Sequence, residues 1–188
     1  MKIPIETSNR HVHLSRKDID LLFGEGYCLN VLRELSQPGE FAAEERVSLL
    51  HNGFEISDVR VLGPARDETQ VELLTRDLDV LGFDCPVKTS GDLEDTPGLR
   101  IRGLKGEVTI EKGVIIANRH LHLTEEDALG LGLKSNVVSM KVGDKILDNV
   151  VVRIDSNARL AVHINKDDEF AEFVDVGTCG ELVEDNLS

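Results

Sequence analysis

Apolar and polar positions alternate over short stretches of the chain, and turn-forming residues end these stretches at close intervals. Alternation with a period of two residues is typical of half-buried β-strands. The turn signals are Asn52-Gly53, Gly63-Pro64, Gly106, Gly113 and Gly143-Asp144. Short strands joined by such turns favour small closed barrels over a parallel α/β sheet. We therefore expect a mainly β protein with short helices.

An internal repeat divides the chain. Residues 9–15 read NRHVHLS and residues 118–124 read NRHLHLT, an offset of 109 positions. Each copy follows a strand-like apolar stretch, at residues 3–5 and 114–117, and precedes a helix capped by a serine or threonine, at residues 15–23 and 124–131. Glycine at positions 24 and 132 should end these helices.

A second, weaker internal similarity supports the same division of the chain. Residues 59–73 resemble residues 150–164, so that Glu72 and His163 occupy equivalent strands at an offset of 91. Short helices should follow at Thr75 and after Asn165. Residues 89–106 indicate a connecting loop, and residues 41–50 suit a helix or a strand equally. The pattern predicts two tandem small β-barrel domains related by an internal repeat.

Composition excludes several classes of function. The chain has 188 residues, without a run of a dozen apolar ones, which excludes a membrane span, and its N-terminal sequence lacks a secretory pattern. The net charge of −14 is spread along the chain and argues against nucleic acid as a partner. Cys28, Cys85 and Cys179 form neither a disulfide framework nor a zinc ribbon, and we expect them to be core thiols.

Histidines in the repeat carry the candidate chemistry. Two histidines separated by one residue project from the same face of a strand, which is a chelating arrangement. The third ligand of each group comes from the equivalent strands that carry Glu72 and His163. Zinc accepts both imidazole nitrogen and carboxylate oxygen. The sequence thus predicts two metal sets, His11, His13 and Glu72 in the first copy and His120, His122 and His163 in the second.

Other polar residues near these motifs are weaker candidates. Arg66 follows a turn one short strand before Glu72, where it could bind an anion or lie exposed. Ser8 and Asn9 adjoin the first histidine motif and could orient ligands or donate hydrogen bonds. Arg10 and Arg119 should face away from the histidines and form salt bridges, and the sixth histidine, His51, should be a solvated loop residue.

In combination, these motifs resemble the PduL-type phosphotransacylases, also called phosphate propanoyltransferases. The resemblance runs from about Ile5 to beyond His163. It is carried by SNRHVHLS at 8–15, PGEFA at 38–42, VLGPAR at 61–66, TQVE at 69–72, SGD at 90–92 and RHLH at 119–122.

The resemblance implies a fold of two β-barrels, each taking a strand from the segment before the other copy's histidine motif. The expected domains are residues 10–113, and residues 1–9 with 114–188. It also implies a dinuclear zinc site between the barrels, with two Zn²⁺ per chain held by the two predicted sets, and phosphate bound by Arg66. We also expect Ser8 and Asn9 to bind substrate.

The implied reaction is reversible transfer of a propanoyl or acetyl group between coenzyme A and orthophosphate, by direct attack of zinc-bound phosphate on the thioester. Expected partners are acyl-CoA, orthophosphate and an acetate or propionate kinase, and a homodimer is compatible with the chain. Only ten residues precede His11, so the expected location is cytoplasmic rather than a microcompartment.

Two positions depart from the family pattern. Asn9 stands where some members have a cysteine, which shortens the ligand set of the second zinc. Glu40 stands where glutamine is expected and places a negative charge beside an anion pocket. Two alternatives stay open: a dizinc hydrolase of thioesters or phosphoesters, and a non-enzymatic zinc-binding module.

Overall fold

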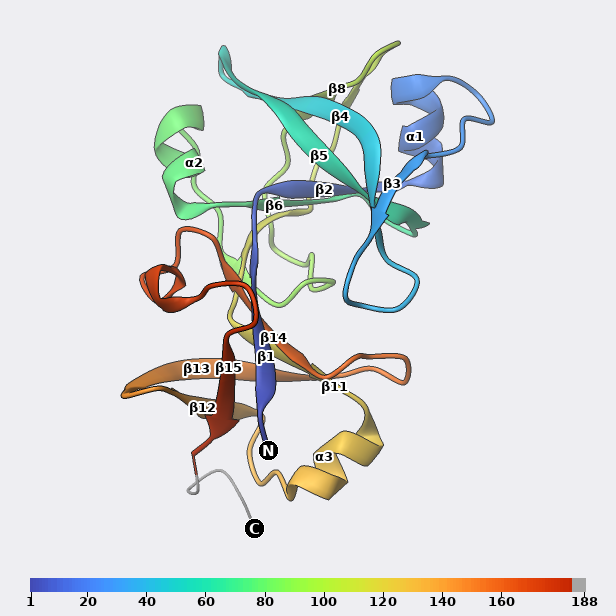
Figure 1. Cartoon of the computed structure of the whole chain (residues 1–188). Coiled ribbons are helices and arrows are strands. Elements are labelled where there is room, and N and C mark those ends of the chain that lie inside the picture. Colours follow the sequence, from blue (N-terminus) through green and yellow to red (C-terminus); the bar gives the residue numbers. More distant parts are fainter. Residues whose placement is uncertain (184–188) are drawn as a thin grey trace. The chain divides into compact units, whose positions relative to one another are not determined.

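The computed structural model describes residues 1–183 and confirms a mainly β protein (Figure 1). The chain forms two compact units. The central unit is residues 9–117, and the split unit is residues 1–8 together with the described residues from 118 onward. Within residues 1–183, none of the helices is long and apolar enough to cross a membrane.

The split unit is a closed barrel of six strands. Strands from both ends of the chain lie side by side in it, because β1 pairs with β14 and β15 (Figure 1). Alternate apolar side chains fill the interior, among them Ile3, Leu121 and Val150. The strands, in barrel order, are β1 (Ile3–Ser8), β14 (Ala161–Asn165), β11 (His120–Leu123), β13 (Lys145–Ile154), β12 (Val137–Val142) and β15 (Cys179–Leu182).

The central unit contains a nine-stranded sheet around a separate aliphatic core. The split unit is therefore a closed barrel, whereas the strands of the central unit pair as a sheet. Its strands, in sheet order, are β7 (Val87–Lys88), β10 (Val114–Ala117), β6 (Gln70–Leu73), β2 (His11–Ser15), β5 (Phe54–Arg66), β4 (Phe41–His51), β8 (Arg100–Arg102) and β9 (Glu107–Thr109), with β3 (Val31–Glu34) paired to β4.

Each histidine strand lies in a different unit from the strand that precedes it. β1 belongs to the split unit and β2 to the central unit, while β10 belongs to the central unit and β11 to the split unit. Residues 114–117, assigned above to the second domain, instead pair in parallel with β6, and all four are buried. Their continuous apolar character suits a strand covered on both faces.

The predicted helix caps are confirmed. Ser15 and Thr124 cap α1 (Arg16–Phe23) and α3 (Glu125–Leu131) by accepting hydrogen bonds from backbone N–H groups in the first turn, and glycines follow both helices. The helix predicted at Thr75 is α2 (Thr75–Leu81). Between Asn165 and residue 183 the helical structure is a short 3₁₀ turn, η1 (Ala171–Phe173).

One open alternative is decided, and two local expectations need correction. The segment that suited a helix or a strand equally is strand β4, and the predicted loop at residues 89–106 contains β8, which pairs with β4. His51 ends β4, half-buried, with its ring against Phe83 and Nδ1 3.1 Å from the Leu81 carbonyl oxygen. It is therefore packed rather than solvated, because the following Asn52-Gly53 turn closes a hairpin.

The expectation of core thiols is met only in part, because Cys85 packs, partly buried, against the core of the central unit. Cys28 is exposed, and Cys85 and Cys179 are partly buried, all with free thiols. Burial, reinforced by the Asp84 carboxylate, raises the pKa of the Cys85 thiol to about 11.

Candidate metal centres

The central unit gathers His11, His13 and Glu72, here called the central set. β2 runs antiparallel to β6 with His11 directly opposite Glu72, and the alternation of β2 brings His13 to the same face. All three side chains are buried, and one donor atom from each lies within 4.8 Å of the others.

Hydrogen bonding orients His11 within this set. Its Nδ1 lies 2.8 Å from the carbonyl oxygen of Asn9, and its Nε2 lies 3.4 Å from Glu72 Oε2. A carbonyl that accepts from one ring nitrogen leaves the other nitrogen as the donor to a metal. Burial pushes the pKa of His11 down, the Glu72 carboxylate pushes it up, and the net shift is upward.

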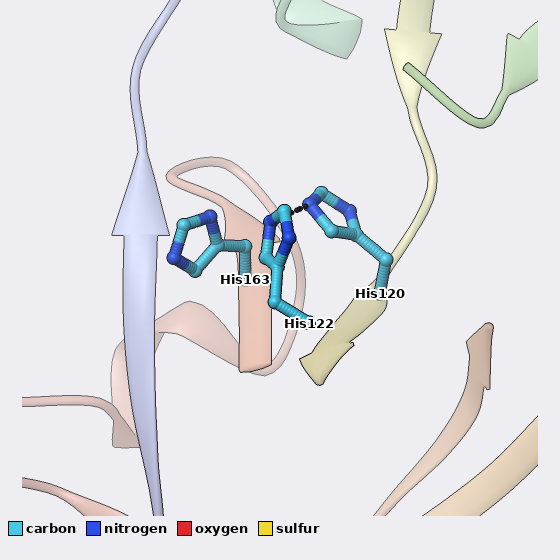
Figure 2. A group of neighbouring side chains, drawn as sticks. All are labelled: His120, His122 and His163. Atoms are coloured by element: carbon cyan, nitrogen blue, oxygen red, sulfur yellow. Dashed lines mark hydrogen bonds between the residues drawn. The ribbon is translucent and has the colours of Figure 1, made fainter. Parts of the chain in front are cut away.

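The split unit gathers His120, His122 and His163, the split set. His120 lies directly opposite His163 across β11 and β14, as His11 lies opposite Glu72. Figure 2 shows the three imidazole rings together, two from β11 and one from β14. The Nε2 atoms of His120 and His122 are 3.0 Å apart, and His120 Nδ1 lies 2.8 Å from the Asn118 carbonyl oxygen.

A carboxylate adjoins the split set that the sequence analysis did not identify. Glu6 lies beside His163 across the parallel pair β1 and β14, with Oε2 3.2 Å from His163 Nε2. A carboxylate at one ring nitrogen of a ligating histidine fixes the ring and increases its basicity. The strand exchange hides this contact from sequence reasoning, since 157 positions separate the two residues.

Both sets fit a zinc ion in donor chemistry and spacing. Ligand atoms about 2.0 Å from a tetrahedral ion lie about 3.3 Å from one another. The separations of 3.4 Å in the central set and 3.0 Å in the split set are close to this value. Histidines that bind zinc in proteins are usually buried, and a carbonyl group commonly holds the ring nitrogen that does not bind the metal.

Arg66 lies at the end of β5, opposite Ser15 of β2. Its Nη1 donates to Ser90 Oγ at 3.3 Å, and its Nη2 donates to Glu40 Oε1, also at 3.3 Å. The guanidinium charge opposes the upward pKa shift of His11, which places it within electrostatic reach of the central set. Glu40, noted above as a departure from the family pattern, therefore forms an ion pair with the candidate anion-binding arginine.

Ser8 and Asn9 have different surroundings. Ser8 ends β1 in the split unit, where its hydroxyl donates to the Ile164 carbonyl oxygen at 3.4 Å. Asn9 begins the central unit, and its exposed side chain accepts a hydrogen bond from the Arg10 N–H at 2.9 Å. The contribution of Asn9 to the central set is its carbonyl oxygen, which contacts His11.

The arginines inside the two histidine motifs form salt bridges, as predicted. Arg10 binds the carboxylate of Asp77 with two nitrogens, at 2.5 and 2.7 Å. Arg119 binds Asp168 in the same way, with both distances 2.8 Å. Such paired contacts fix the strand beside the histidines through geometry as well as charge.

Comparison with known proteins identifies the family. A family model described as phosphate propanoyltransferase matches residues 4–175. Among the most similar relatives, the phosphate propanoyltransferase of Clostridioides difficile is 43% identical, over 96% of this chain and 88% of the relative. That of Thermotoga maritima is 45% identical, over 97% of this chain and 89% of the relative. The chain therefore belongs to the phosphate propanoyltransferase family, a family of phosphotransacylase enzymes.

Proposed function

We propose that this protein reversibly transfers a short acyl group, propanoyl or acetyl, between coenzyme A and orthophosphate. The observation that carries the proposal, within this family, is the placement of Arg66 at the end of β5, the strand that pairs with histidine strand β2 of a buried set of metal-ligand side chains. An arginine beside a metal site is suited to a doubly charged anion such as phosphate, which its planar fork binds through two oxygens.

Each set would hold one zinc ion. His11, His13 and Glu72 would hold one, and His120, His122 and His163 the other. When bound, zinc supplies a Lewis-acid charge that polarises an oxygen atom and offsets the negative charge of the reactants. This local positive charge is needed because the chain as a whole carries a net charge of −14.

Arg66 would bind and orient phosphate. Its two terminal nitrogens contact Ser90 and Glu40, so an incoming phosphate would compete with the Glu40 carboxylate for the guanidinium. The guanidinium would then hold the phosphate and screen its charge as negative charge develops on the thioester oxygen. Ser8 and Asn9 stay candidates for contacts with the substrate.

The proposed chemistry is a direct transfer. A phosphate oxygen attacks the thioester carbonyl carbon, the new carbon–oxygen bond forms, the carbon–sulfur bond breaks, and the proton of hydrogen phosphate passes to the departing thiolate sulfur. The products are acyl phosphate and coenzyme A. None of Cys28, Cys85 and Cys179 belongs to either set, so the route requires no acylated cysteine.

The test measures coenzyme A release from acetyl-CoA and propanoyl-CoA by the zinc-loaded protein, with and without phosphate. We expect release to require phosphate, and Arg66→Ala to lower kcat/KM for phosphate about 100-fold or more. Arg46→Ala is the matched control, because Arg46 lies on β4 of the same unit and forms an exposed pair with Asp58. It should leave the rate unchanged.

Two results would overturn the proposal. Release at the same rate without phosphate would identify a dizinc hydrolase, in which water replaces phosphate as the nucleophile. Retained zinc with no turnover of either thioester would identify a zinc-binding module.

The product suggests a metabolic place for the reaction. An acyl phosphate is a phosphoryl donor, so we propose that an acetate or propionate kinase consumes it, in the cytoplasm. Microscopy of a tagged copy tests the location, and signal confined to microcompartments would contradict it.

A further inference from the structure

Gln70 is a buried polar residue to which the proposed reaction has so far given no role. It begins β6, two positions before Glu72, so both side chains lie on the same face of the strand. Across the antiparallel pair it lies opposite His13, as Glu72 lies opposite His11. Only 1% of its surface is exposed.

The hydrogen bonds of Gln70 fix the orientation of its amide. The backbone N–H of Gly91 donates to Gln70 Oε1 at 2.8 Å, and because an N–H can only donate, the amide oxygen must face it. Gln70 Nε2 donates to Glu72 Oε1 at 2.6 Å and to Ser90 Oγ at 2.9 Å. An ionised carboxylate can only accept, so the same orientation satisfies Glu72.

Ser90 continues this chain of contacts to Arg66. Its Oγ accepts from Gln70 Nε2 and also from Arg66 Nη1. A hydroxyl oxygen has two lone pairs, so it can accept both bonds together. Gln70 is therefore one hydrogen bond from a member of the central set and two from the proposed phosphate-binding arginine.

The repeat provides an internal comparison. In the split unit the residue opposite the second histidine of the motif is Ala161, which faces His122 as Gln70 faces His13. Alanine has no polar side chain that could form such a link. The repeated strand geometry therefore does not by itself require the link from the third ligand to an arginine.

We propose that Gln70 is a positioning residue for both Glu72 and Arg66. It holds the Glu72 carboxylate in the orientation that binds metal, and through Ser90 it holds the guanidinium that binds phosphate. The Arg66 part of this inference rests on the proposed function, whereas the Glu72 part requires only that the central set binds zinc.

The experiment compares Gln70→Met with Ser90→Ala in the full-length protein. Methionine has a similar length and cannot form these hydrogen bonds, so we expect one of two zinc ions to bind about 10- to 100-fold more weakly, as for loss of other hydrogen-bond partners of metal ligands. Titration of the metal-free protein with zinc against a chromophoric chelator measures this. KM for phosphate should rise in both variants, and zinc affinity should fall only in Gln70→Met.

Thermal unfolding of the metal-free protein separates positioning from general stability, and Gln70→Asn is the second variant if methionine prevents folding. Its shorter amide should also weaken one zinc ion. Unchanged affinity for both zinc ions in a folded Gln70 variant would overturn the assignment to Glu72. Unchanged KM for phosphate in an active Gln70 variant would overturn the assignment to Arg66. Wild-type protein that binds two zinc ions but shows no phosphate-dependent release would refute the proposed function, while the zinc titration still decides the role at Glu72.

Discussion

In both units, a strand bearing two histidines runs antiparallel to the strand that supplies the third donor, and the first histidine is held by the carbonyl group two residues before it. The units differ in the third donor: the central set ends in Glu72 and the split set in His163. The carboxylate of Glu72 belongs to its set, whereas Glu6 contacts His163 from a neighbouring strand. The repeat thus supplies the geometry, and single residues at equivalent positions set the charge.

The residues that surround the two sets also differ. Around the central set, Gln70 and Ser90 connect Glu72 to Arg66. In the split unit, Ala161 occupies the position equivalent to Gln70. We infer that the central set is adapted to position phosphate, while a zinc ion in the split set would retain more positive charge because its three protein ligands are neutral.

Loss of one histidine from either set should have the largest effect. We expect His13→Ala and His122→Ala each to lose one zinc ion and to lower phosphate-dependent coenzyme A release about 100-fold or more, because each removes a direct metal ligand. Metal content by mass spectrometry and the release rate are the readouts. His51→Ala is the matched control, since His51 lies outside both sets. A variant of either set that keeps two zinc ions and full activity would contradict the assignment.

Removal of the carboxylate beside the split set should have a smaller effect. Glu6→Gln eliminates the charge next to His163, and we expect zinc affinity of the split set to fall about tenfold. Chelator competition measures the affinity. Thr7→Ala, a change at the neighbouring exposed residue, should have no effect. If Glu6→Gln instead weakened the central set, the comparison between the two sets would be wrong.

Replacement of Glu40 should have a modest effect on phosphate binding in the central unit. Because the pair between Glu40 and Arg66 is partly exposed, its contribution is small, and Glu40→Gln should lower KM for phosphate by about 1.4- to 5-fold. Initial rates at varied phosphate concentration test this expectation. A rise in KM would show that Glu40 assists phosphate binding rather than competing with it.

Chemical modification of the thiols should have the smallest effect on activity. With the pKa of Cys85 at about 11, its thiolate fraction at pH 8 is about 10⁻³, so iodoacetamide should modify exposed Cys28 first. We expect activity after modification of Cys28 to stay within about twofold of its initial value, because direct transfer uses no thiol nucleophile. Complete inactivation that parallels labelling of one cysteine would favour an acylated enzyme.

Sequence reasoning was most effective where a local pattern determined the structure. The caps at Ser15 and Thr124, the common face of His11 and His13, and the equivalence of Glu72 with His163 follow from strand and helix periodicity. The surroundings of the sets were missed because they depend on pairing between distant segments. Glu6 reaches His163 only through the exchange of β1, and Gln70 meets Gly91 and Ser90 only after a turn folds back onto β6. Alternation did place Gln70 on the face of Glu72, a signal that could have identified it.

The most direct test of the account is ³¹P NMR of the protein incubated with propanoyl-CoA and orthophosphate at increasing zinc content. We predict that an acyl phosphate resonance appears, that chelation of zinc abolishes its formation, and that full formation returns when two zinc ions are bound per chain. Absence of the acyl phosphate resonance when two zinc ions are bound per chain, or equal formation of acyl phosphate by the chelator-treated protein, would contradict the account.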